Sequence, residues 1–187
     1  DAQKIAGSAH FLEHKLFAKK DGDISHKFEE IGADVNAFTS FNETMFYCSG
    51  IDHTPKMLDL LFELVGKPYF TKQNIAQEAP IIQQELAMYK NDPIWSINNA
   101  ILTAMFDHSN LGTEVVGTEK SINEITVQNL TKAYKNNYIP SKMQFVACGD
   151  FSDNQVQTIL RTVGKLQEKY FQNRKATPTK IEMPIGN

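Results

Sequence analysis

The 187-residue sequence has little of what marks several large classes of protein. It contains only two cysteines, and its 19 basic and 22 acidic residues leave a formal net charge of −3. Two distant thiols in a chain of this length fit reduced cysteines better than a disulfide scaffold, although a single disulfide stays open. Without an excess of Lys and Arg to attract phosphates, the composition predicts no nucleic-acid partner. No run reaches about 18 apolar residues, which predicts no membrane partner.

What is present is the composition of one globular domain, with 41% hydrophobic and 22% charged residues. Reduced cysteines favour a cytoplasmic location. Because the sequence begins at Asp1, without an initiator Met or a signal peptide, we expect it to be a piece of a longer chain. A polar tail with two prolines predicts a linker at 173–187, which leaves 1–172 as one partial domain.

Apolar periodicity and capping residues predict mostly helices with a few strands between them. The expected helices are 8–17, 24–31, 54–66, 71–89, 94–106, 127–138 and 152–171, and the expected strands are 33–40, 45–49 and 144–148. A hairpin among irregularly placed helices indicates an α+β fold, with a mixed or antiparallel sheet packed against helices. Three short strands make a thin sheet, so we expect further strands before Asp1.

The most informative motif is the sequence His10-Phe-Leu-Glu13-His14 on the first predicted helix. At about 100° per residue, positions i, i+3 and i+4 share a face, so both imidazoles and the carboxylate point the same way. Two histidines one turn apart can bind one zinc ion, but a catalytic zinc site needs a third protein ligand and an open position for water. A helix whose histidines merely face solvent is the alternative, and it predicts no stoichiometric zinc.

Two glutamates in the predicted helix at 71–89 are candidates for the third metal ligand and for a group that orients a histidine ligand. Glu78 and Glu85 are seven residues apart and therefore share a face. Glu85 follows an apolar stretch, where a carboxylate without a partner is costly. A metal ion would satisfy Glu85, and Glu78 could orient a histidine ligand. Taken alone, the two side chains could equally be exposed, and Pro80 between them predicts a kink that would alter their shared face.

With this motif and these glutamates, the sequence resembles the pitrilysin/insulinase family of zinc metallopeptidases, the inverzincins. It is most similar to small bacterial, processing-protease-like members. The resemblance covers residues 1 to about 170 and rests on residues 7–17, residues 32–39, Gly117-Thr118-Glu119 with Ile122, and Tyr138 and Pro140 before a segment ending in Gly149. It implies one zinc ion per domain, held by His10, His14 and Glu85. It further implies Glu13 as the general base and Glu78 as a group that supports a histidine ligand.

The resemblance also implies a peptide-binding edge at Asn36, Ala37, Phe38 and Thr39, where an extended peptide would add as a further strand. A plain structural hairpin explains the same residues equally well from composition alone.

Together these features predict the N-terminal catalytic domain of a zinc-dependent endopeptidase that hydrolyses short or unfolded peptides, with a zinc-bound water activated by Glu13. In the resembling family, a closed chamber is built from several such domains, and an Arg/Tyr pair comes from the opposing half. We therefore expect a second half of the same chain, or a partner subunit, to supply the rest of the chamber, and the 187 residues alone to cleave peptides poorly. The alternative is a non-catalytic homologue that binds a peptide or a partner protein.

Overall fold

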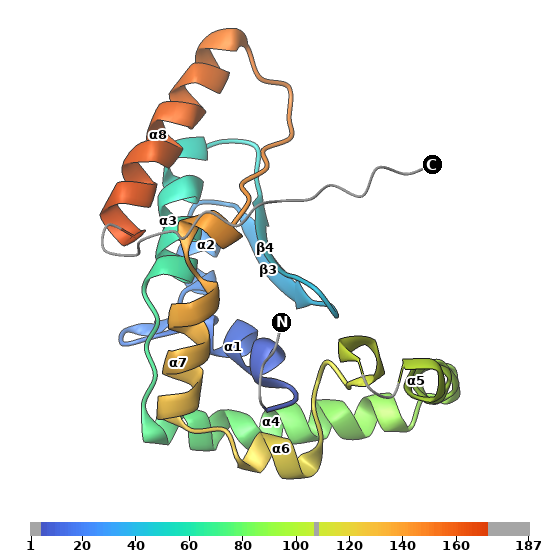
Figure 1. Cartoon of the computed structure of the whole chain (residues 1–187). Helices are drawn as coiled ribbons and strands as arrows, with labels where there is room; N and C mark the ends of the chain where they lie inside the picture. Colours follow the sequence, from blue (N-terminus) through green and yellow to red (C-terminus); the bar gives the residue numbers. More distant parts are fainter. Residues whose placement is uncertain (1–4, 107–108, 172–187) are drawn as a thin grey trace, which may run out of the picture.

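The computed structural model describes residues 5–106 and 109–171 and is rich in helices (Figure 1). The longer helices are α1 (Ser8–Phe17), α3 (Thr54–Gly66), α4 (Lys72–Lys90), α5 (Pro93–Phe106), α7 (Val127–Asn137) and α8 (Asp153–Phe171). The short helices are α2 (Ser25–Glu29), α6 (Glu119–Asn123), and the 3-10 turns η1 (Asn110–Gly112) and η2 (Pro140–Lys142). The linker predicted at 173–187 lies outside the described residues and stays a prediction.

Two small antiparallel sheets complete the fold. Strands β1 (Ala18–Lys19) and β2 (Gly22–Asp23) form one, and β3 (Asp34–Thr39) and β4 (Thr44–Ser49) form the predicted hairpin. In the hairpin, the register runs from the Asp34 and Ser49 pair to the Thr39 and Thr44 pair. Helices packed against antiparallel strands confirm the α+β class.

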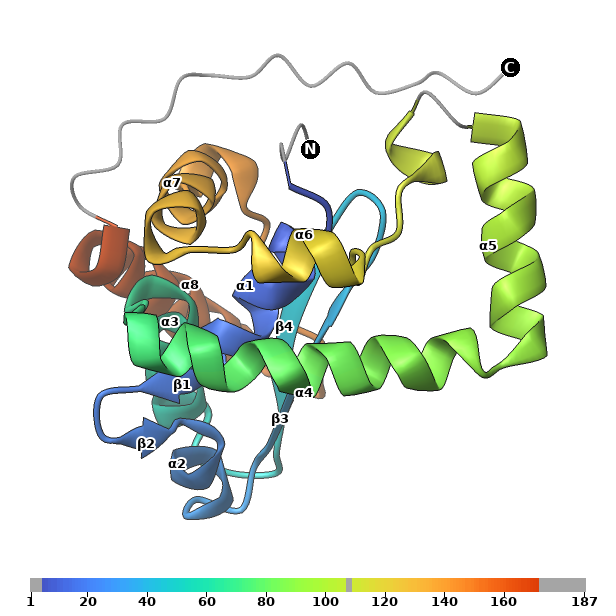
Figure 2. The same ribbon diagram turned by 90° about the horizontal axis from the view of Figure 1, so that it is seen from below.

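Helix α1 lies at the centre, between the β3–β4 hairpin and the long helix α4 (Figure 1). Seen from below, α6 and α7 lie on the same side of α4 as α1 (Figure 2). Helix α5 follows the C-terminal end of α4 and runs across the direction of α4. The core where α1, α4, α6 and α7 meet contains the fully buried side chains of Phe11, Leu12, Leu16, Ile82, Leu86, Ile122 and Leu130. In contrast, α5 contains no buried residue. The deepest packing therefore surrounds α1.

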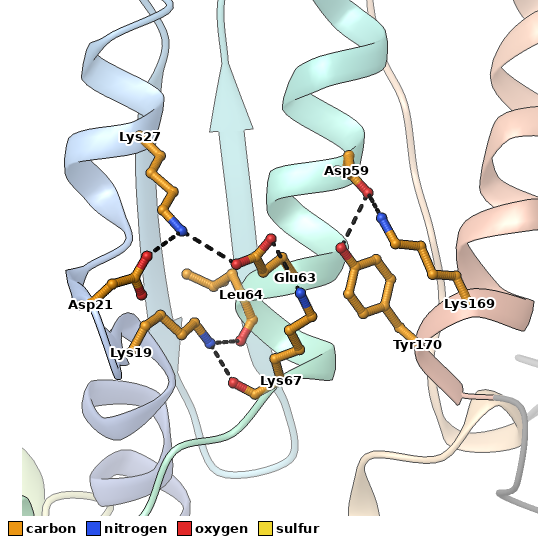
Figure 3. A network of polar contacts seen from close by, with 9 residues as sticks. All are labelled: Lys19, Asp21, Lys27, Asp59, Glu63, Leu64, Lys67, Lys169 and Tyr170. Carbon is orange, nitrogen blue, oxygen red and sulfur yellow. Dashed lines mark hydrogen bonds and ion pairs between the residues drawn. The ribbon is translucent and has the colours of Figure 1, made fainter.

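Helix α3 connects this core to α8 and to a network of charged side chains (Figure 3). The buried ammonium of Lys19 donates hydrogen bonds of 2.8 Å to the carbonyl oxygens of Leu64 and Lys67 at the end of α3. These carbonyls have no partner within the helix, so Lys19 satisfies the helix terminus. Burial lowers the pKa of Lys19 to about 8.

The strand predicted at 144–148 is wrong: these residues belong to neither sheet. A strand exists only where a neighbouring strand accepts and donates its backbone hydrogen bonds. None of the described residues pairs with this segment, and Val146 within it is 75% exposed.

Helix α6 is not among the predicted helices, because it has only five residues and too little periodicity to detect. It begins at a capping box in which the side chains of Thr118 and Ser121 each accept from the other's backbone N–H. Helix α4 continues through Pro80 as one helix. No helix in the described part of the chain is both long and apolar enough to cross a membrane.

Candidate metal centre

The position of α1 depends on a close backbone contact at its start. Gly7 is the N-cap residue and has a φ of 81°, a left-handed conformation that favours glycine. A Cβ atom at this position would lie 2.5 Å from the carbonyl oxygen of Val116. Any side chain at Gly7 would therefore push α1 away from the segment before α6.

The two histidines of α1 lie next to each other and face α4. Their ring centroids are 4.6 Å apart, and the ring planes make an angle of 62°. The side chain of His10 is 9% exposed, and that of His14 is 25% exposed. The helical spacing thus produces the shared face that the sequence predicts.

Glu85 of α4 faces both imidazoles. Its Oε1 atom lies 3.6 Å from Nε2 of His10, and its Oε2 atom lies 3.5 Å from Nε2 of His14. One ligand atom from each of the three residues lies within 4.8 Å of the other two. The three side chains predicted to bind the metal are therefore together.

The separations within this cluster fit a shared metal ion better than direct hydrogen bonds. An N–H···O hydrogen bond typically spans about 2.7–3.2 Å. Two atoms that are each about 2.0–2.1 Å from a tetrahedral zinc ion lie about 3.4 Å apart, close to the observed 3.5 and 3.6 Å. The second ring nitrogen of His10, Nδ1, is buried without a hydrogen-bond partner. The donor set of two imidazoles and one carboxylate is also one that zinc prefers.

Glu78 lies beside His14, as the resemblance implies. Its Oε1 atom is 3.1 Å from Nδ1 of His14, and its Oε2 atom accepts a 2.8 Å hydrogen bond from the buried ammonium of Lys15. Burial alone would raise the pKa of Glu78, but the hydrogen bonds from His14 and Lys15 lower it to about 2. An ionised Glu78 accepts a hydrogen bond from the Nδ1–H group of His14, which leaves the Nε2 lone pair available toward Glu85.

The two histidines have opposite electrostatic environments. Burial, followed by the proximity of His14, lowers the pKa of His10 to about 4. Burial would also lower the pKa of His14, but the hydrogen bond and charge of Glu78 raise it above its ordinary value. His10 is therefore neutral near pH 7, the form that binds metals, while at His14 a metal ion would compete with a proton.

Glu13 is buried on the same helix, next to the hairpin. Burial raises the pKa of its carboxyl group, and the hydroxyl of Thr39 donates a hydrogen bond to its Oε2 atom. A carboxyl group with a raised pKa beside such a candidate metal site can accept a proton and return it.

The four residues predicted to bind peptide divide between the two faces of β3. Asn36 and Phe38 are exposed, whereas Ala37 and Thr39 are half-buried on the face that packs toward α1. The Asn36 side chain accepts a 2.8 Å hydrogen bond from the backbone N–H of Ala37. Of the four residues, Thr39 is the one that forms a hydrogen bond with a candidate site residue, Glu13.

Sequence reasoning missed two neighbours of the cluster. Lys15 occupies the position one turn after Phe11, on the buried face of α1, and a lysine there needs a partner. Tyr89 is one turn after Glu85 on α4, and hydrogen bonding to Glu85 accompanies burial in raising the pKa of its phenol. Lys15 is four residues after Phe11 and Tyr89 is four residues after Glu85, so the i, i+4 spacing of a helix could have identified both neighbours.

The sequence profile of "Insulinase (Peptidase family M16)" matches residues 1–119, and that of "Peptidase M16 inactive domain" matches residues 124–185. The uncharacterized zinc protease YmfH of Bacillus subtilis is 38% identical over 143 residues, which cover 76% of this chain and 33% of YmfH. The uncharacterized zinc protease YmxG of the same organism is 26% identical over 174 residues, which cover 90% of this chain and 42% of YmxG.

The crystal structure of a putative M16-like peptidase from Alicyclobacillus acidocaldarius has a similar fold. Its TM-score is 0.81 at 32% identity, over 87% of this chain and 38% of that chain. The chain thus spans between 33% and 42% of the length of these three relatives. Because the first profile matches well over half of the residues, the chain belongs to the insulinase family of peptidases, family M16.

Proposed function

We propose that this chain forms the catalytic part of a zinc-dependent endopeptidase that hydrolyses short or unfolded peptides. The observation that carries the proposal is the convergence of His10, His14 and Glu85 at separations that suit three ligands of one ion. Both curated relatives are named zinc proteases, and these names support zinc as the metal.

In this proposal His10, His14 and Glu85 hold the ion. A zinc ion bound by three protein ligands supplies a Lewis acid that lowers the pKa of a bound water towards about 7 and polarises a carbonyl group. Glu78 keeps the proton of His14 on Nδ1, because its carboxylate accepts a hydrogen bond from that nitrogen. A second hydrogen bond, from Lys15, holds the carboxylate in place.

Glu13 acts as the general base and later as the general acid. Its carboxylate takes a proton from the attacking water and delivers that proton to the leaving amine. Burial favours the protonated form, so the group can hold the proton between the two transfers.

The peptide is proposed to lie along the edge of β3 that is not paired with β4. Among the described residues β3 has only β4 as a neighbour, so its other edge can accept an added strand. The exposed Asn36 and Phe38 would then lie beside the peptide. Backbone pairing demands an extended peptide but little particular sequence, which favours short or unfolded substrates.

Zinc content tests the metal part of the proposal. After dialysis against zinc and removal of excess metal, we expect one zinc ion per chain by elemental analysis. Glu85→Gln should retain markedly less, whereas Glu168→Gln, at an exposed position of α8, should match the wild type. Equal zinc in the Glu85→Gln variant would contradict the ligand assignment.

Cleavage tests the chemical part. In this single-turnover assay, with the chain in excess over a quenched fluorescent peptide, we expect slow hydrolysis, because the groups expected from the opposing half of the chamber are not among these 187 residues. Glu13→Gln should abolish this hydrolysis while zinc content stays unchanged.

The match of residues 124–185 to an inactive-domain profile favours one competing function, a non-catalytic subunit that binds peptide. Peptide binding and full zinc content without any cleavage dependent on Glu13 would support that function and contradict ours.

A further inference from the structure

Thr39 ends β3 on the face of the hairpin that packs against α1. Its hydroxyl lies in hydrogen-bond contact with Oε2 of Glu13, and its Oγ1 atom is 3.2 Å from Oγ1 of Thr44 on β4. Thr39 and Thr44 are directly paired across the two strands. The end of the hairpin is therefore bonded to the carboxyl group that we propose as the base.

Counting hydrogen atoms determines the direction of both bonds. An ionised carboxylate has no proton to donate, so the single hydroxyl hydrogen of Thr39 must go to Glu13. Thr39 can then only accept from Thr44, whose hydroxyl must be the donor of the second bond. The two hydroxyls form a chain of donors that ends at Oε2 of Glu13.

This arrangement distinguishes the two oxygens of Glu13. Oε2 is the oxygen that accepts the hydrogen bond from Thr39. We propose that Thr39 is a positioning residue that holds the Glu13 carboxylate by Oε2, so that Oε1 is the atom that exchanges the proton. This inference rests on the proposed endopeptidase function and assigns a new part to one of its residues.

The proton transfers balance with Thr39 unchanged. One O–H bond of the attacking water breaks and an O–H bond forms on Oε1 of Glu13. That bond then breaks as the proton moves to the nitrogen of the departing amine. The hydroxyl hydrogen of Thr39 stays on Thr39 throughout, so the residue orients the base without itself reacting.

The geometry also separates Thr39 from the peptide-facing residues of the same strand. Asn36 and Phe38 alternate with it and point to the exposed face, where they pair with Tyr47 and Met45. Side chains at odd and even positions of a strand face opposite sides. Changing Thr39 should therefore affect the chemical step rather than peptide affinity.

Thr39→Val tests this inference, because valine keeps the shape and suits a strand but cannot donate a hydrogen bond. In the single-turnover assay, we expect the maximal rate to fall about tenfold or more, with the concentration for half-maximal rate unchanged within about twofold. Thr39→Ser retains the hydroxyl and should restore the rate to within about threefold. Thr158→Val, on the exposed face of α8, removes a hydroxyl of no importance to the site and serves as the control.

Crystal structures of Thr39→Val and Thr39→Ser supply a readout that needs no turnover. We expect the Glu13 carboxylate to leave its present position only in the valine variant, while zinc content matches the wild type in both. A Glu13 that stays in place in Thr39→Val, a maximal rate equal to the wild type, or a loss of peptide affinity alone would overturn the inference. If the wild type shows no cleavage dependent on Glu13, the proposed function fails and this inference fails with it.

Discussion

Two of the regions in which charged side chains meet, one around α3 and one between α1 and α4, are built differently. Around α3, two pairs of oppositely charged atoms are in direct contact: Lys169 Nζ is 2.7 Å from Asp59 Oδ1, and Lys27 Nζ is 2.9 Å from Asp21 Oδ2 (Figure 3). Between α1 and α4, Glu85 instead stays 3.5 and 3.6 Å from two histidines.

Burial deepens the contrast. The side chain of Lys169 is 52% exposed, whereas that of His10 is 9% exposed. Exposed ion pairs can relax into contact at little cost, because water solvates whatever remains unpaired. Burying polar groups that are too far apart to form hydrogen bonds costs free energy, so such an arrangement needs a compensating interaction. In our proposal a metal ion between α1 and α4 provides that interaction. Four predictions test the contrast between the two regions.

The largest expected difference concerns stabilisation by zinc. Two matched carboxylate-to-amide changes, Glu85→Gln between α1 and α4 and Asp59→Asn beside α8, should differ in their response to zinc. At a free zinc concentration about 100 times the dissociation constant, binding to the native state adds about 2.7 kcal/mol to the free energy of unfolding. Thermal unfolding with and without zinc should show this gain in the wild type and in Asp59→Asn.

In Glu85→Gln the gain should be nearly absent. The same zinc-dependent shift in both variants would mean that the metal binds elsewhere. A loss in both variants would mean that the two regions do not differ in the way we describe.

The next largest effect should follow the loss of Lys15, the buried cation at the metal site. Lys15→Met keeps the length of the side chain but leaves Glu78 without one of its two hydrogen-bond donors. We expect the free energy of unfolding of metal-free protein to fall by about 2 kcal/mol, since an uncompensated buried charge is strongly destabilising. Urea denaturation in the presence of a chelator measures this change.

Lys169→Met is the matched control in the exposed network, and its effect should be clearly smaller. Equal effects of the two substitutions would remove the distinction between buried and exposed pairs.

Acid should destabilise the α1–α4 region through Glu78. The pKa of Glu78 is about 2 in the folded protein and lies near the ordinary glutamate value of 4.5 when the chain is unfolded. The unfolded state therefore binds more protons between these values, so the stabilisation is present above pH 4.5 and is lost as the pH falls towards 2.

In metal-free protein, Glu78→Gln should flatten the stability profile across this pH range. Denaturation curves at several pH values will show it, and a variant as steep as the wild type would contradict the assignment.

The smallest effect should come from salt on the exposed network. Asp59→Asn removes the partner of Lys169, and a surface pair of this kind is screened by ions. We expect a small loss of stability at low ionic strength that disappears near 1 M salt. A loss that persists at high salt would show that the pair behaves as a buried one.

The sequence by itself determined the local part of the site. His10, Glu13 and His14 share a face because helix geometry relates residues three and four apart, and α1 has the predicted bounds. The hairpin and the six longer helices were likewise predictable from periodicity and capping residues. Membership of the family was visible from the motifs alone, because those motifs are local as well.

Only the tertiary structure decided which residues from distant segments meet. The contacts of Lys15 with Glu78 and of Thr39 with Glu13 join residues 63 and 26 positions apart, and no local rule predicts such pairs. The wrong strand at 144–148 has the same origin, since a strand depends on a neighbour that local sequence does not specify. Helical patterns reflect interactions within a few residues, whereas pairing and side-chain contacts depend on how whole elements pack.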